Sequence, residues 1–330
     1  MRRNLLYIFL IVAVAATALA GCRNRRGNAP KTSVGEPYEL FVICDDTAWE
    51  NHIKEAVKET LECYVPGLSR PEKYFHVVDH ADMDSVNEVE RMHSNILAIR
   101  IDPTFSTPVM TESQDVNATA QLVITINAAS AIEAAQFIYA NGWDIREKFE
   151  HNERLIHFRT LTATKSEMPI EIIKNLTGIE MHVPGGFFVA KPKEDVLEWF
   201  VRKYDNKQQH IFVFTDPCED INAVSKEQLI ALVDSHIGVI SVKDEEGSYM
   251  CISQNKESLI EARDINGRVW YELRCGWRVE GYTMGGPMVS YTTYDDANKR
   301  LITIAFALFS PEQHQRHDMA QLESLIYLTK

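Results

Sequence analysis

Residues 266–280 read NGRVWYELRCGWRVE and carry the clearest structural pattern in this chain. From residue 268 to residue 280, apolar side chains at the odd-numbered positions alternate with a second set that is mostly charged. A period of two is typical of a long β-strand with one buried face. Asn266-Gly267 is a hairpin-turn signal, which predicts that this strand pairs with residues 260–265.

The rest of the second half predicts an antiparallel sheet with helices around that strand. Residues 288–294 and 301–309 are predicted to form a second hairpin. Long antiparallel strands flanked by helices give an α+β domain, which we place at residues 166–330. Shorter strands are predicted at 187–190, 196–201 and 210–214, and helices at 169–176, at 225–238, and from Asp318 as N-cap onward.

The first half alternates strand and helix patterns. Residues 40–44 form a continuous apolar run, as in a strand that is buried on both faces. We therefore expect an α/β domain at residues 35–165, so the chain as a whole is α+β. A capping box of Thr47 and Glu50 is predicted to start the first helix. Further strands are predicted at 74–78, 96–101 and 122–126, and residues 103–119 are predicted to form a loop or irregular edge. Further helices are predicted at 82–93 and after Ser130, the latter with a break at Gly142.

Length and composition set the limits of the function. With 330 residues, of which 45% are hydrophobic, the chain is long enough for two hydrophobic cores. A net charge of −13 argues against general nucleic-acid binding, which needs clustered Lys and Arg. Besides Cys22 the chain has five cysteines and no Cys-x-x-Cys pair. This favours buried thiols over one disulfide but leaves both open. The five are Cys44, Cys63, Cys218, Cys251 and Cys275.

The N-terminus has the pattern of a lipoprotein leader. Arg2 and Arg3 precede an apolar run at residues 5–19, which is too short to span a bilayer comfortably. Leu19-Ala20-Gly21-Cys22 looks like a bacterial lipobox. We therefore predict a signal peptide at 1–21, lipidation of Cys22 with acyl chains such as palmitate, and membrane attachment through this anchor.

The segment after the lipobox predicts the side of the membrane. Residues 22–34 contain four basic residues and no acid, and Gly27, Asn28 and Pro30 disfavour regular structure, as in a flexible tether. Basic side chains can lie on anionic headgroups. We expect an outer-membrane lipoprotein on the periplasmic side rather than at the cell surface.

Several short motifs are spread along the mature chain: residues 34–40, Asp45-Asp46, Trp49, 65–68, Pro71-Glu72, Phe75, His93, 95–97, 276–280, 284–287 and Ser290-Tyr291. In these motifs the chain resembles a family of Bacteroidetes lipoproteins that is catalogued as a domain of unknown function. The resemblance implies location and architecture and no chemistry. The order of elements in the second half also resembles the α-β-α sandwich of PsbP and Mog, which bears on architecture alone.

The polar face of the long strand is the first candidate binding surface. One face of the strand carries Arg268, Trp270, Arg274 and Arg278. Three guanidinium groups beside an indole could recognise an anionic glycan, peptidoglycan or a partner strand. Cross-strand salt bridges under a helix or under solvent are the alternative. The segment Met284-Gly285-Gly286-Pro287 lies at the expected hairpin rim, where it is either a turn or a contact loop.

Three further positions are candidates. Asp45 and Asp46 follow a buried strand, where open α/β sheets bind ligands, although helix capping explains the pair equally well. Ser85 lies in an Asp-Ser-Val triplet that fits a periplasmic O-glycosylation pattern. His314 and His317 are spaced for a shared metal ion, but a solvated loop is favoured, and we predict no metal site and no cofactor.

No enzyme signature appears in the sequence. We therefore expect a non-enzymatic, lipid-anchored binding or assembly factor of the periplasm, with another envelope protein or an anionic glycan as its partner. The alternative is an envelope hydrolase or transferase that acts on cell-wall or glycan substrate, with Asp45 and Asp46 near its site.

Overall fold

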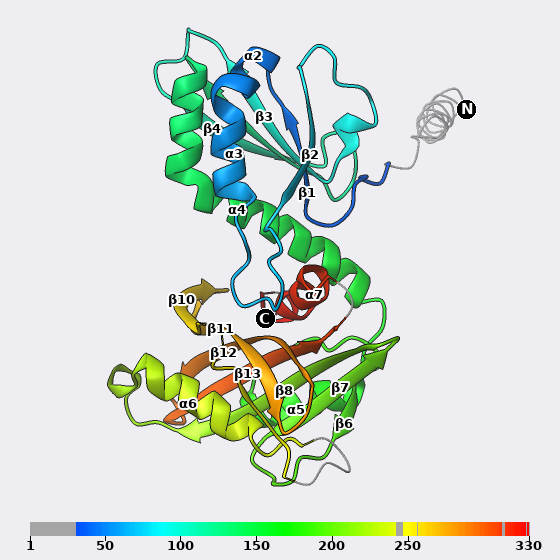
Figure 1. The fold of residues 1–330 in the computed structure, drawn as a ribbon, viewed down its shortest axis with the longest axis vertical. Helices are drawn as coiled ribbons and strands as arrows, with labels where there is room; N and C mark the ends of the chain where they lie inside the picture. The colour runs from blue at the N-terminus through cyan, green and yellow to red at the C-terminus, as the bar shows by residue number, and fades with distance from the viewer. Residues whose placement is uncertain (1–30, 242–246, 256, 312–313, 328, 330) are drawn as a thin grey trace, which may run out of the picture.

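A computed structural model describes residues 31–241, 247–255, 257–311, 314–327 and 329. The expected signal peptide, Cys22 and the tether up to Pro30 lie outside the described residues. The last part of the expected tether lies against the N-terminal domain, because Thr32 bridges Thr119 and Val34 bridges His93. The structure has two separate sheets with helices, which confirms the α+β fold class (Figure 1).

The N-terminal sheet has five strands in the order β2-β1-β3-β5-β4. β4 is antiparallel and forms one edge, whereas the other strands run parallel and β2 forms the opposite edge. The expected loop or edge at residues 103–119 thus contains a regular strand. The bounds are β1 Glu39–Ile43, β2 His76–Ala81, β3 Asn95–Ile101, β4 Val109–Gln114 and β5 Leu122–Ala128.

Helices cover one face of this sheet: α2 (Asp46–Ala48), the π-helical turn η1 (Trp49–Ile53), α3 (Lys54–Leu61) and α4 (Ala131–Leu161). The prediction that Thr47 caps the first helix is wrong, because the Asp45 side chain accepts a hydrogen bond from the backbone N of Ala48 at 2.9 Å. The predicted helix at 82–93 is also wrong, since that segment contains only the 3-10 turn η2 (Glu90–Met92).

α4 is one helix of 31 residues, so the predicted break at Gly142 is wrong. A Cβ at position 142 would lie 2.6 Å from Cβ of Thr60 on α3. The glycine therefore allows two helices to approach closely. Ser130 caps α4 as predicted, accepting a hydrogen bond from the backbone N of Glu133.

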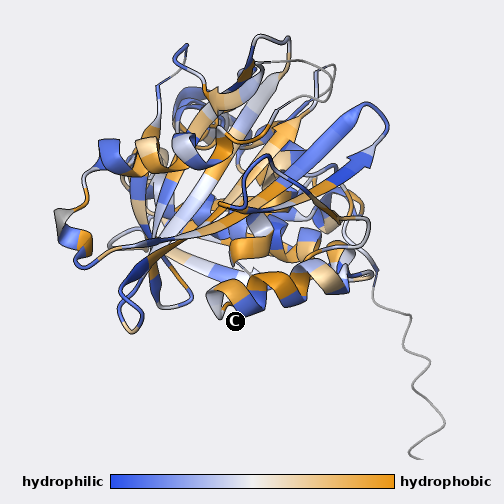
Figure 2. Cartoon of the chain, turned by 90° about the horizontal axis from the view of Figure 1, so that it is seen from below, coloured by the Kyte–Doolittle hydropathy of each residue, from blue (hydrophilic) through white to orange (hydrophobic). Residues whose placement is uncertain are grey.

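The C-terminal sheet has the strand order β10-β11-β12-β13-β8-β7-β6, with β9 paired to β11. Both predicted hairpins are confirmed, β10 with β11 and β12 with β13. Figure 2 shows hydrophobic residues gathered in the middle of the fold and hydrophilic residues at the loop ends. The bounds are β6 Phe188–Ala190, β7 Glu198–Tyr204, β8 Lys207–Pro217, β9 Tyr249–Ile252, β10 Leu259–Ile265, β11 Arg268–Glu280, β12 Gly285–Asp295 and β13 Arg300–Phe309.

Helices cover both faces of the C-terminal sheet, which gives three α-β-α layers. One core lies under α6 (Lys226–Ile237), which follows the 3-10 turn η3 (Ile221–Ala223). The other core lies under α5 (Glu167–Thr177) and α7 (Arg316–Tyr327). Asp318 is not the N-cap of α7, because the helix begins at Arg316 and the Asp318 carboxylate pairs with Lys207 at 2.7 Å.

α7 lies between the two sheets, together with the end of α4 and the loop at residues 62–75 (Figure 1). Ala320 of α7 belongs to the N-terminal core, whereas Met319 and Leu322 belong to the C-terminal core. The two domains therefore share one helix at their junction. Within the part of the chain that is described, no helix is both long and apolar enough to cross a membrane.

Candidate functional site at the junction of the two sheets

Asp45 and Asp46 lie at the carboxyl ends of the parallel strands, as predicted. A pocket of about 590 Å³ opens there, and Asp45, Asp82 and Arg100 are among its lining residues. Strand order places β2 and β3 on opposite sides of β1, so this is the crevice where open α/β sheets bind ligands. Asp46 is exposed and lies 3.3 Å from Nε2 of His80.

We call this the strand-end pocket. Two of its acids also accept hydrogen bonds from backbone N atoms. Asp45 caps α2, and Asp82 accepts a hydrogen bond from the backbone N of Asp84 at 3.0 Å. The π-helical turn η1 contributes Asn51 and His52 to the pocket wall. π-helical turns are rare overall, but many of those that occur lie at functional sites. The pocket therefore offers room and polar groups, although its carboxylates already have a structural role.

The four residues expected to form an open basic face do not do so. Trp270 is 2% exposed, and the side chain of Arg274 is 11% exposed, because α7 covers this side of β11. Arg278 pairs with Glu280, and Arg268 is exposed with its guanidinium 5.9 Å from the centre of the Trp270 ring. The expected open face is therefore wrong, and the alternative of ion pairs under a helix describes Arg274.

The segment Met284–Pro287 is not an open contact loop. β12 begins at Gly285, and both Gly286 and Pro287 are buried. A Cβ at position 286 would lie 1.9 Å from the carbonyl oxygen of Leu308 on the neighbouring strand. Gly286 is therefore required by close strand packing.

The remaining candidates do not converge on one site. Ser85 lies in an exposed turn and donates a hydrogen bond to the carbonyl oxygen of Asp82 at 3.1 Å, so its glycosylation stays a prediction. His314 is exposed, whereas His317 is half-buried against His157. No cluster of three potential metal ligands occurs among the described residues. The five described cysteines are all unpaired thiols.

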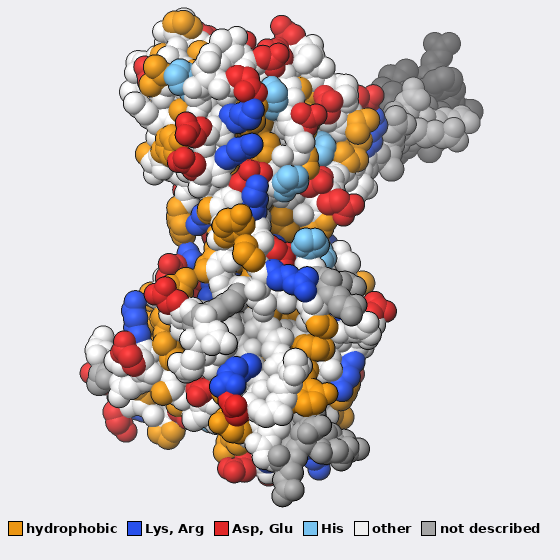
Figure 3. Space-filling view, in the orientation of Figure 1, with side chains coloured by type: hydrophobic (Ala, Val, Ile, Leu, Met, Phe, Trp, Pro, Cys, Tyr) orange, Lys and Arg blue, Asp and Glu red, His pale blue; other side chains and the backbone are white. Residues whose placement is uncertain are grey.

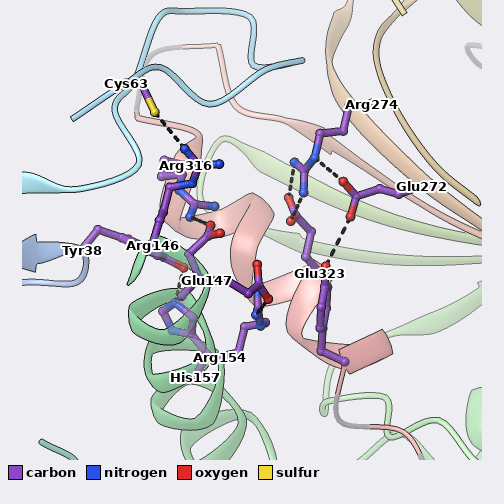
Figure 4. Close-up of polar contacts among 12 residues, drawn as sticks. Tyr38, Cys63, Arg146, Glu147, Arg154, His157, Glu272, Arg274, Arg316 and Glu323 are labelled. Atoms are coloured by element: carbon purple, nitrogen blue, oxygen red, sulfur yellow. Dashed lines mark hydrogen bonds and ion pairs between the residues drawn. The ribbon is translucent and has the colours of Figure 1, made fainter. Parts of the chain in front are cut away.

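Charged side chains are buried where the two domains meet (Figure 4). Arg316 at the start of α7 pairs with Glu150 of α4 at 2.6 Å, and its guanidinium lies 4.2 Å from the centre of the Tyr38 ring. The Tyr38 hydroxyl lies 2.9 Å from Nε2 of His157. Burial lowers the pKa of His157 to about 3, so this imidazole is neutral.

A second group of ion pairs joins α7 to the long strand β11. The guanidinium of Arg274 donates to both carboxylate oxygens of Glu323, at 3.1 and 2.6 Å, and to Glu272 at 2.8 Å. Arg154 of α4 pairs with Glu147 and lies 3.9 Å from the centre of the Tyr327 ring. Buried pairs of this kind fix the orientation of the elements that carry them.

A cleft of about 260 Å³ opens beside this network, and we call it the junction cleft. Its walls are rich in arginine and aromatic residues, and Figure 3 shows basic and hydrophobic side chains next to each other at the waist of the molecule. The lining residues are Cys63, Tyr64, Pro66, Tyr74, Trp143, Arg146, Leu259, Glu261, Arg263, Glu272 and Arg274.

Sequence reasoning found one member of this cleft, Arg274, and missed the rest. The lining comes from the loop after α3, the middle of α4, and strands β10 and β11. These segments lie far apart in the chain, and their local patterns indicate only a turn, a helix and two strands. No sequence signal marks Trp143, because it lies one turn after Tyr139 on the same helical face, and its exposure of 56% is seen only in the structure.

Comparisons with known proteins divide the chain at the same junction. Residues 33–161 match the family model of a domain of unknown function (DUF8532), and residues 166–328 match that of another domain of unknown function (DUF4837). Two domains of unknown function thus account for most of the chain. No curated protein matches it.

Proposed function

We propose that this chain is a lipid-anchored envelope protein, attached through Cys22 to the periplasmic side of the outer membrane, which binds an envelope component in the junction cleft without changing it chemically. The lipobox and the basic tether support the anchor. The observation that carries the binding role is the junction cleft itself, which is small and is lined by aromatic side chains and by three arginines beside two glutamates. Clefts between domains are preferred ligand sites.

The surroundings of the junction cleft suit a binding site. Arg274 is held by two carboxylates, and α7 packs into both cores, so one wall of the cleft is rigid. A preorganised wall lowers the entropy that binding costs. Two aromatic side chains remain exposed at the cleft, Trp143 at 56% and Tyr64 at 63%. Exposed aromatic residues beside arginine are typical of interaction sites.

Photo-crosslinking in the native envelope tests this role. The crosslinking residue p-benzoylphenylalanine replaces Trp143 in the full-length protein, and Tyr139 serves as the matched control position. Tyr139 is an exposed aromatic residue on the same helix that does not line the cleft. We expect a discrete adduct from position 143 and none from position 139. Equal labelling at both positions would contradict a binding role for the cleft.

The anchor has its own test. We expect Cys22→Ser to move the folded protein from the membrane fraction to the soluble fraction, because the acyl chains supply most of the membrane affinity. Protease treatment of intact cells should leave the wild-type protein uncut if it lies on the periplasmic side. Cleavage before the outer membrane is opened would place it at the surface instead.

An envelope hydrolase or transferase is the second candidate function, and the strand-end pocket is the observation that favours it. Asp45, Asp82 and His52 line this pocket at the point where open α/β sheets bind ligands. The test is incubation of the purified protein with peptidoglycan, followed by measurement of new reducing ends and free amines. Product that disappears in Asp82→Asn would support the enzyme and overturn the binding-only role.

A further inference from the structure

Two of the three arginines in the junction cleft are already neutralised. Arg274 has Glu272 and Glu323 as partners. Arg263 pairs with Glu261 at 2.7 Å, and its guanidinium also lies 3.8 Å from Glu272. A buried or half-buried cation with carboxylate partners has little attraction left for a further anion.

Arg146 differs from these two arginines. Its Nη1 donates to the sulfur of Cys63 at 3.1 Å, and its guanidinium lies 4.2 Å from the centre of the Tyr74 ring. Burial raises the pKa of Tyr74 to about 12, so this phenol is neutral, and a thiol is a weak acceptor. Among the described residues, Arg146 forms no ion pair with a carboxylate.

The acids nearest to Arg146 in sequence have other partners. Asp144 pairs with Lys148, Glu147 pairs with Arg154, and Glu150 pairs with Arg316. Arg146 therefore brings a positive charge without a carboxylate partner to the cleft wall, where its guanidinium lies over the Tyr74 ring. A planar guanidinium fixed in this way can bind a carboxylate through two parallel hydrogen bonds.

The charge around Arg146 also selects the kind of anion. Glu261 and Glu272 line the same cleft, so a dianion such as a phosphate monoester would be repelled by them. A single negative charge meets about half of this repulsion and still pairs with Arg146. The cleft volume of about 260 Å³ holds a ring-sized group and not a folded partner.

Exposed aromatic faces complete the site. Trp143 and Tyr64 lie at the cleft, and the guanidinium of Arg263 lies 5.8 Å from the centre of the Trp143 ring. An indole held by a cation on one side offers a flat apolar surface to a ring in the cleft.

We infer that the junction cleft binds a sugar ring that carries one carboxylate, a uronic acid unit of an acidic glycan, with Arg146 as the anion-binding residue and Trp143 as the stacking residue. This inference rests on the proposed binding function and names its ligand class.

Fluorine NMR on the full-length protein in detergent micelles tests the inference. The protein is labelled with 5-fluorotryptophan, and Trp143→Phe identifies the resonance of Trp143 among the five tryptophans. The probes are D-glucuronate, the neutral sugar D-glucose and the dianion glucose 6-phosphate. We expect glucuronate to shift the Trp143 resonance at millimolar concentration, with little effect of the other two probes.

Variants of Arg146 supply the second half of the test. Arg146→Gln removes the charge and should weaken glucuronate binding by about tenfold to a hundredfold, the loss expected for a charge-assisted bidentate contact. Arg146→Lys should retain part of the affinity. Arg159→Gln is the matched control, because Arg159 is exposed on the same helix outside the cleft, and it should bind as the wild type does. Circular dichroism checks that each variant folds.

Three results would overturn the inference: an equal shift with glucose, a stronger shift with glucose 6-phosphate, or unchanged glucuronate binding in Arg146→Gln. If glucuronate causes no shift while position 143 still crosslinks in the envelope, the ligand class is wrong and the binding function stands. A crosslink from position 143 that contains only protein would likewise replace the glycan with a protein partner. Loss of both signals removes the cleft as a binding site.

Discussion

Glu153 of α4 lies inside the N-terminal domain with 1% of its surface exposed. Its carboxyl group accepts a hydrogen bond from Nδ2 of Asn95 at 2.6 Å. Burial raises the pKa of Glu153 to about 7, which outweighs the lowering by the Asn95 hydrogen bond. The folded state therefore prefers the protonated carboxyl group at a pH where the unfolded chain is ionised.

We predict that Glu153→Gln stabilises the protein in a pH-dependent way. The pKa of Glu153 in the folded state lies above its value in the unfolded chain. The contribution of its protonated carboxyl group to the free energy of unfolding is therefore fully present below about pH 4.5 and is lost as the pH rises towards 7. Glutamine keeps the acceptor for Asn95 and removes the charge. The free energy of unfolding should rise by about 2–3 kcal/mol at pH 8 and little at pH 4.5. Urea denaturation at both pH values measures this, and an equal gain at both would rule out titration as the cause.

Gly142 shows how packing can outweigh helix propensity at a single residue. Alanine is favoured over glycine inside a helix by about 1 kcal/mol. At position 142, however, a Cβ would lie 2.6 Å from Cβ of Thr60, a distance that side chains do not tolerate. We predict that Gly142→Ala destabilises the protein by about 1–3 kcal/mol, because α3 and α4 must move apart. Thermal unfolding measures the effect, and an increase in Tm would mean that propensity dominates.

At the scale of elements, α7 is held to β11 by the ion pairs of Arg274. We predict that Glu323→Gln lowers the free energy of unfolding by about 2–4 kcal/mol, because it leaves the buried guanidinium with Glu272 alone. The matched control is Glu167→Gln, which removes an exposed ion pair with Lys165 and should change stability by less than about 1 kcal/mol. Equal effects of the two substitutions would show that the Arg274 pair contributes no more than a surface pair.

Local signals predicted the elements whose causes are local. The Asn266-Gly267 turn and the alternation after it predicted the β10–β11 hairpin. The helix predicted at residues 225–238 is α6, and the structure shows the capping box of Ser225 and Gln228 at its start. The segment at residues 82–93 has helical spacing without a strong apolar stripe, and its polar side chains bind the nearby backbone instead. Asp82 accepts a hydrogen bond from the backbone N of Asp84, and Asn87 accepts from the backbone N of Val89 and of Glu90. Such bonds favour turns over a helix.

The candidate site could be predicted only in part, because its burial depends on elements that lie far away in the sequence. Asp45 follows a buried strand, so sequence alone placed it at the carboxyl edge of the sheet. Burial of Trp270 and Arg274 depends on α7, which follows β11 by more than 30 residues. A period of two identifies two faces of a strand but does not say which other element covers them.

At the scale of the whole molecule, the net charge of −13 has two opposed parts. The first 34 residues contain six basic residues and no acid, whereas the remaining residues contain 28 basic and 47 acidic ones, so the two parts carry +6 and −19. Anionic lipid attracts the first part and repels the second. If the chain carries the anchor proposed at Cys22, we expect this polarity to keep the body, and with it the junction cleft, away from an anionic membrane surface.

The shared helix α7 makes a prediction about the whole molecule. Ala320 packs in the N-terminal core, Met319 and Leu322 pack in the C-terminal core, and Arg316 pairs with Glu150 of α4. Loss of the C-terminal fold would therefore remove a buried side chain from the N-terminal core and leave Glu150 without its partner. The stability of each domain depends on the other through one element.

We therefore predict a single cooperative unfolding transition in urea. Far-UV circular dichroism reports on both domains, whereas tryptophan fluorescence is weighted towards the C-terminal sheet, which contains Trp199, Trp270 and Trp277. The two probes should give the same midpoint, and Arg316→Met should shift both midpoints together, because it removes the pair with Glu150 at the junction. Two separate midpoints would instead show that each domain is stable without the other, in which case ligand binding at the junction cleft would be expected to change the domain arrangement.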